Sequence, residues 1–184
     1  MRTEVHVHGS IFLCKGVRLK QVEQALRPWL EYLDVETLVD AHSLEREEPG
    51  IAFDARERTL NICWTGEVGR NFQEKLGTAI QNVGPLTEYA SEIEVTYYPD
   101  HGDDEFYQVF VGPTPESIHE FRRQCVVEDA TQLLSRHLGK PEVDQVATLI
   151  SELFGKSQPP KQPATEQSGS STVIPLHPRN KHLH

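Results

Sequence analysis

The sequence has few cysteines, a single methionine and no long apolar run. Its three cysteines, Cys14, Cys63 and Cys125, are far apart and form no C-x-x-C pair, which argues against a disulfide framework and against a zinc knuckle. No stretch approaches the roughly 20 consecutive apolar residues that cross a bilayer. The first residues alternate in polarity instead of forming the apolar core of a signal peptide. We therefore expect a cytoplasmic protein that does not enter a membrane.

Positive charge is also scarce. The 184 residues hold 18 Lys and Arg against 28 Asp and Glu, which gives a formal net charge of −10. Direct binding of nucleic acid is not expected, because phosphates are bound mainly through Lys and Arg. Residues 156–184 carry four cations against Glu166 alone, so residues 1–155 are the more acidic part. Such a surface favours a basic protein partner.

Common catalytic and nucleotide-binding motifs are missing. The sequence contains no G-x-S-x-G, no Walker pattern and no G-x-G-x-x-G, so it gives no indication of a nucleophilic triad or a dinucleotide site. We assign no catalytic residue and no cofactor, and an enzyme is the less favoured class.

Hydrophobic periodicity indicates an α+β fold. Strands are expected at 4–13, 51–54, 59–65, 92–98 and 106–111, and helices at 17–33, 71–83, 114–138 and 141–154. The order β-α-β-β-α-β is that of the ferredoxin-like split βαβ fold, here with an added fifth strand and two C-terminal helices. Pro28 is expected to kink or split the first helix. The last helix has an apolar stripe, so we expect it to dock on another surface.

The composition changes after Gly155. Residues 1–155 are predicted to form the domain with its C-terminal helix pair, and residues 156–184 a disordered tail rich in Pro, Ser and Gln. Val173, Ile174 and Leu176 form a short apolar island within the tail. They are either a linear motif for a partner or part of a plain solvated segment.

The polar side of the predicted sheet holds a candidate metal site. Strand one should lie between strands three and four, which would bring His6 and His8 beside Cys63 on one flank and Glu94 on the other. These donors suit zinc or another borderline transition metal, or an acid/base pair. Alternatively, the C-terminal helices cover this face and the histidines are hydrogen-bonded at its margin.

Two further groups are candidates for binding. Lys15, Arg18, Gly66, Gly69 and Arg70 precede the first two helices, and we expect them at one edge of the sheet as an anion site, although glycines at such turns often serve backbone geometry alone. Tyr98 and Tyr107 on the last two strands are either core residues or an aromatic patch for a partner.

The sequence therefore favours a non-enzymatic, acidic interaction or regulatory protein that docks a basic protein partner; an inhibitor or nucleic-acid mimic is a special case. The alternative is a small-ligand or metal-binding protein or enzyme. It would use His6, His8 and Cys63, or the predicted anion site at Lys15, Arg18 and Arg70. Partner capture would support the first class, whereas stabilisation by a metal or nucleotide would support the second.

Overall fold

The computed structural model describes residues 2–156. Within this range the chain forms two compact units that divide after Pro115. The first unit contains strands β1 (Thr3–Phe12), β2 (Gly50–Asp54), β3 (Thr59–Val68), β4 (Ser91–Tyr98) and β5 (Glu105–Val111), with helices α1 (Leu19–Tyr32) and α2 (Phe72–Val83) and the short 3₁₀ helices η1 (Leu38–Asp40) and η2 (Gly84–Leu86). The second consists of α3 (Pro115–Leu134) and α4 (Lys140–Lys156).

The strands form a single antiparallel sheet in the order β2-β3-β1-β4-β5. The expectation that the first strand lies between the third and the fourth is confirmed, since Val7 is paired with Trp64 on β3 and with Val95 on β4. The described residues thus form a mixed α+β structure with a five-stranded antiparallel sheet and four α-helices.

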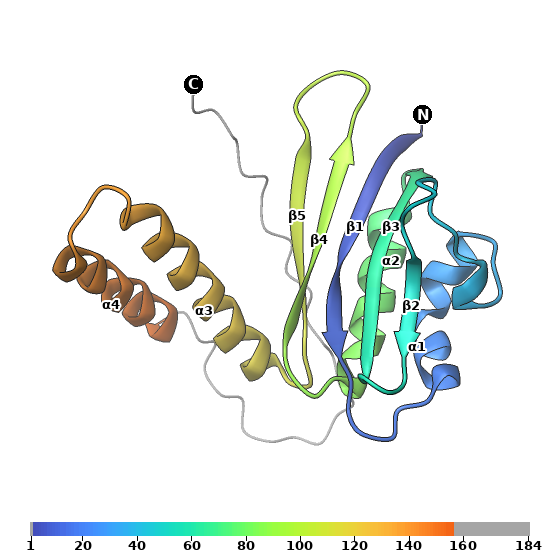
Figure 1. Cartoon of the computed structure of the whole chain (residues 1–184), viewed down its shortest axis with the longest axis horizontal. Helices are drawn as coiled ribbons and strands as arrows, with labels where there is room; N and C mark the ends of the chain where they lie inside the picture. The colour runs from blue at the N-terminus through green and yellow to red at the C-terminus, as the bar shows by residue number, and fades with distance from the viewer. Residues whose placement is uncertain (1, 157–184) are drawn as a thin grey trace. The chain divides into compact units, whose positions relative to one another are not determined.

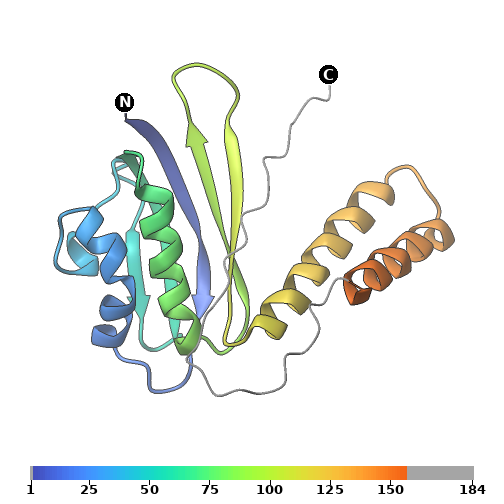
Figure 2. The same ribbon diagram turned by 180° about the vertical axis from the view of Figure 1, so that it is seen from behind.

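Both helices of the first unit cover the same face of the sheet (Figures 1 and 2). The alternation in β1 turns Val5, Val7 and Ile11 inward, where each is fully buried, because successive strand residues point to opposite faces. The α1 stripe of Val22, Leu26, Trp29 and Leu30 is also fully buried. Burial of this stripe explains why Pro28 does not split α1: packing outweighs the roughly 3 kcal/mol that an interior proline costs a helix.

An aromatic cluster lies at the centre of this core. The Trp64 ring stacks on Phe72 at 5.9 Å and meets the edge of Trp29 at 5.6 Å between centroids. The Trp64 indole N–H donates to the carbonyl of His42 at 3.0 Å. Gly66, two residues along the same strand face, leaves room for this ring: a Cβ added there would lie 2.3 Å from Trp64 Cη2. The glycine is therefore required by the close approach of the indole.

The second unit is a helical hairpin. An imidazole nitrogen of His119 lies 3.2 Å from the carbonyl oxygen of Phe154, and Arg123 donates to the Ser151 hydroxyl at 2.9 Å. A hydrogen bond from Arg123 lowers the pKa of Glu120 to about 2. Among the described residues of the two helices only Val143 is buried, and Leu149 and Leu153 are more than half exposed. No helix within residues 2–156 is long and apolar enough to cross a membrane.

Candidate functional site

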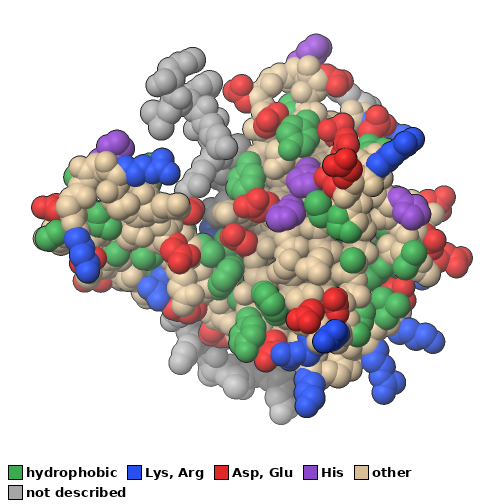
Figure 3. Space-filling view, viewed as in Figure 1, with side chains coloured by type: hydrophobic (Ala, Val, Ile, Leu, Met, Phe, Trp, Pro, Cys, Tyr) green, Lys and Arg blue, Asp and Glu red, His purple; other side chains and the backbone are tan. Residues whose placement is uncertain are grey.

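The strand residues that point away from α1 and α2 make up a surface that we call the polar face. It includes Glu4, His6, His8, Ser10 and Phe12 of β1, Asn61, Cys63, Thr65 and Glu67 of β3, and Glu94, Thr96 and Tyr98 of β4. Figure 3 looks onto this surface, where histidine side chains lie among acidic ones. Phe12 and Tyr98 are exposed large side chains towards opposite ends of β1.

The strand register brings the predicted metal ligands into neighbouring positions. His8 is paired with Cys63 on one side and with Glu94 on the other, so these three residues form one row across the sheet. His6 lies in the next row of this face, opposite Thr65, and its ring stacks on that of His8 at 6.0 Å. His8 therefore lies beside Cys63 and Glu94 as expected, whereas the direct neighbour of His6 on β3 is Thr65.

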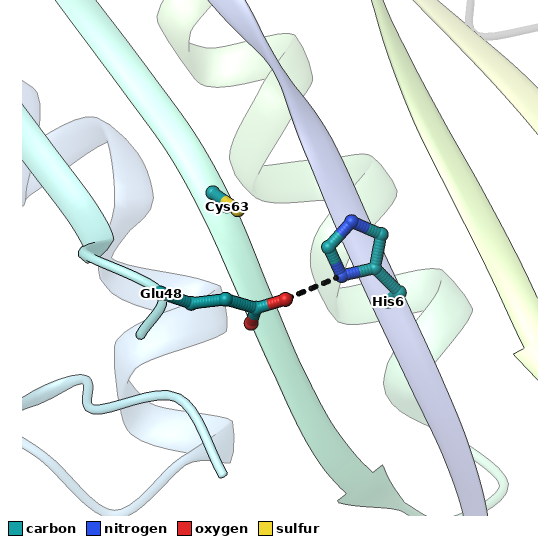
Figure 4. A group of neighbouring side chains, drawn as sticks. All are labelled: His6, Glu48 and Cys63. Atoms are coloured by element: carbon teal, nitrogen blue, oxygen red, sulfur yellow. Dashed lines mark ion pairs between the residues drawn. The ribbon is translucent and has the colours of Figure 1, made fainter. Parts of the chain in front are cut away.

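A carboxylate from outside the sheet completes the tightest cluster. Glu48, in the loop before β2, places a carboxylate oxygen 3.2 Å from His6 Nδ1. One donor atom each from His6, Glu48 and Cys63 all lie within 4.8 Å of one another. Figure 4 shows the three side chains converging from β1, the loop and β3. We call these three residues the His6–Glu48–Cys63 cluster.

Hydrogen bonds from two hydroxyl groups fix the carboxylate of Glu48. Thr65 Oγ1 donates to Glu48 Oε1 at 3.1 Å and lies 2.9 Å from His6 Nδ1. Ser43 donates to the other carboxylate oxygen, while its own oxygen accepts the backbone N–H of Thr65 at 2.9 Å. These bonds bridge the loop to β3, so the carboxylate is held over the strand.

The cluster is only partly accessible to solvent. The side chains of His6 and Glu48 are 27% and 18% exposed, and Cys63 is half-buried. Burial, and secondarily the negative charge of Glu48, raises the pKa of the Cys63 thiol. In chemical terms the cluster combines a thiol, an imidazole and a carboxylate, the three side-chain types that bind zinc.

The predicted anion site is not assembled as expected. Lys15 and Arg18 follow β1, whereas Gly66, Gly69 and Arg70 lie at the end of β3 or beyond it. The expectation of a shared edge is wrong because β1 and β3 are antiparallel: Phe12 is paired with Thr59, and Thr3 with Val68. The carboxyl ends of β1 and β3 therefore lie at opposite ends of the sheet along the strand direction.

Lys15 instead lies beside cations of the β2–β3 turn. It lines a hollow of about 280 Å³ together with Arg56 and Arg58. Arg58 is already paired with Glu88. At the other end of the sheet, Arg70 lines a groove of about 450 Å³ between α2 and the β4–β5 strands.

The predicted aromatic patch is divided between the two faces of the sheet. Tyr98 is on the polar face and 39% exposed. Tyr107 is on the helix side, opposite Val95, where its ring meets the edge of Tyr97 at 5.7 Å and its hydroxyl donates to Glu105. The two tyrosines therefore do not form one surface. Val173, Ile174 and Leu176 lie outside the described residues.

Glu48 is a residue of the cluster that the sequence did not indicate. The residue lies in a run of acidic residues, Glu45-Arg-Glu-Glu48, which is typical of a solvated loop. Its place over β3 depends on contacts between distant residues, among them the bond from Ser43 to the carbonyl of Thr65. No periodicity or motif in a single sequence indicates such a contact.

The comparisons with known proteins identify the family of the chain. A family model described as "Family of unknown function (DUF6806)" matches residues 3–155. The chain belongs to this family. The match includes every residue of the polar face described above and the His6–Glu48–Cys63 cluster. No curated protein matches the chain, and no solved structure matches it.

Proposed function

We propose that this member of DUF6806 is a non-enzymatic interaction or regulatory module that docks a basic protein partner on the polar face of its sheet. The observation that carries the proposal is the charge of the strands. The five strands that the structure describes contain no Lys or Arg, but they contain Glu4, Asp54, Glu67, Glu92, Glu94 and Glu105. All of these except Glu105 belong to the polar face by register.

The charge of the whole first unit supports the same function. Residues 1–115 hold ten Lys and Arg against twenty Asp and Glu, so the negative potential is concentrated in the unit that carries the sheet. Complementary charge steers a basic partner and raises its association rate. Phe12 and Tyr98, 49% and 39% exposed towards opposite ends of β1, would then supply apolar contacts. Aromatic side chains are enriched in the buried cores of interfaces, and tyrosine is also enriched among the residues that contribute most to binding.

We propose a ferredoxin-like framework for this unit. The element order β-α-β-β-α-β and the antiparallel strand order β2-β3-β1-β4 support it. In such a framework β5 is an added edge strand. The fold carries no function by itself, so the docking proposal depends on the side chains of the polar face.

Charge reversal on the polar face tests the docking proposal. Glu4 and Glu94 are exposed on this face, and Glu4→Lys with Glu94→Lys changes the net charge by four units. The matched control is Glu36→Lys with Glu74→Lys, which makes the same change at exposed positions next to α1 and on α2. The assay is affinity capture by the full chain from lysate, with and without nuclease treatment, and the affinity of each captured partner is measured at two salt concentrations.

We expect a basic protein to be captured by the wild type and by the control pair, with affinity that falls as salt is added. The variant with Glu4→Lys and Glu94→Lys should no longer capture this protein. Equal capture by both pairs, or capture that disappears with nuclease alone, would contradict the proposal.

A further inference from the structure

We propose that the His6–Glu48–Cys63 cluster is a binding site for a divalent transition metal of the zinc type. The inference goes beyond partner docking and does not depend on it. It begins from geometry, because the three donor atoms already lie within 4.8 Å of one another. In a tetrahedral zinc site, with bonds of about 2.0 to 2.3 Å, ligand atoms are separated by roughly 3.3 to 3.8 Å. Closing the cluster around an ion therefore needs movements of about 1 Å.

The chemistry of the donors selects the class of ion. A thiolate and an imidazole favour zinc, cobalt or nickel over magnesium and calcium, which prefer oxygen ligands. The carboxylate brings negative charge into a half-buried position where, among the described residues, only the His6 ring lies within ion-pair distance of it. A divalent cation would neutralise the carboxylate and the Cys63 thiolate together. Three protein ligands leave one coordination position for water or another donor.

The surroundings of the cluster resemble the outer shell of a metal site. Ligating carboxylates and histidines are commonly oriented by further hydrogen bonds, and here Ser43 and Thr65 hold Glu48. Thr65 also contacts the ring of His6 at 2.9 Å. One hydroxyl therefore orients two of the three ligands. The three ligands come from β1, β3 and the loop before β2, so an ion would tie this loop to the sheet.

Cobalt(II) is the probe for this site, because its complexes with thiolate ligands show a charge-transfer band in the near ultraviolet. The full chain is reduced, freed of metal and titrated with cobalt(II), and zinc is then added as a competitor. We expect one thiolate-bound cobalt per chain, displaced by one zinc. Zinc should also raise the thermal midpoint, because the three ligands lie close together only in the folded chain.

Matched variants assign the ligands. Cys63→Ser should abolish the band, whereas Cys14→Ser should retain it, because Cys14 lies after β1 and donates to the carbonyl of Thr87. His6→Ala and Glu48→Gln should weaken cobalt binding by more than the roughly 10- to 100-fold typical of outer-shell changes. His8→Ala is the control for His6→Ala, since His8 is exposed on the same strand and face. It should leave the affinity within a few-fold of the wild type.

The histidines near the end of the chain need their own control. His177, His182 and His184 could bind cobalt without a thiolate, so a full-length variant with all three replaced by Ala should keep the band. Far-ultraviolet circular dichroism checks that each variant is folded. The proposal is overturned if the folded wild type shows no thiolate band, if Cys63→Ser keeps it, or if His8→Ala weakens binding as much as His6→Ala does. Failure of cobalt to bind would not change the expected capture of a basic partner, so the metal proposal and the docking proposal can fail separately.

Discussion

The close approach of Trp64 to Gly66 gives a prediction that links the core to the site. In Gly66→Ala the new methyl group would overlap the indole, at 2.3 Å from Cη2 and 2.4 Å from Cζ2. The ring cannot move freely, because it packs against Phe72 and Trp29. We expect it to be displaced, with loss of the hydrogen bond to the carbonyl of His42.

The expected cost combines two effects. Overpacking a well-filled core costs about 1 to 3 kcal/mol, and the lost hydrogen bond adds roughly 0.5 to 1.5 kcal/mol. The free energy of unfolding should therefore fall by about 1.5 to 4.5 kcal/mol. Urea denaturation followed by tryptophan fluorescence measures this change directly. Because His42 adjoins Ser43, which holds Glu48, the same variant should also weaken cobalt binding.

Gly77 provides the matched control. It lies inside α2, and a Cβ added there meets no heavy atom within 4 Å. Gly77→Ala should therefore stabilise the protein by about 0.5 to 1 kcal/mol through helix propensity and leave the metal site unchanged. A change of less than about 0.5 kcal/mol in the free energy of unfolding of Gly66→Ala, or a shift of both variants in the same direction, would contradict the predicted overlap with Trp64.

Two further predictions concern pH and the C-terminal segment. Burial raises the pKa of Tyr97 to about 12, so the stability contributed by its neutral ring is present below pH 10 and lost as the pH rises through 12. The shift corresponds to about 3 kcal/mol, which partial solvent access reduces to roughly 1 to 2 kcal/mol. Between pH 9 and pH 11, urea titrations should therefore show a smaller decrease in the free energy of unfolding for Tyr97→Phe than for the wild type. An equal decrease in both proteins would contradict the raised pKa of Tyr97. Truncation after Gly155 should leave the thermal midpoint nearly unchanged by scanning calorimetry; a large decrease would show that the removed residues contribute to folding.

Much of the sheet could be predicted from local pattern. The alternation of Val5, Val7 and Ile11 places His6 and His8 on the other face of β1, and the hairpin at 51–65 places Cys63 on β3. These predictions succeeded because a two-residue period and a short turn are local properties of the chain.

The remaining features depend on contacts between distant residues. Glu48 reaches His6 only because the loop at 41–49 is fixed to β3 by Ser43 and Trp64. The predicted anion site failed for a related reason: Lys15 and Arg70 were placed at one edge without following the antiparallel direction of β1 and β3. Strand order alone does not determine which loops meet.

The central position of β1 also affects how the chain folds. This strand is synthesised before both of its partners. Phe12 pairs with Thr59 on β3, which is 47 residues further along the chain, and Gly9 pairs with Ile93 on β4, which is 84 residues further along. At roughly 5 to 20 residues per second, the second partner emerges about 4 to 17 s after the first strand. Both edges of β1 are unpaired until β3 emerges, and the edge that receives β4 stays unpaired for the whole interval, so the nascent chain is most vulnerable then to pairing with the wrong strand. Refolding from denaturant should likewise be limited by these long-range pairings, on the millisecond to second scale typical of non-local sheets.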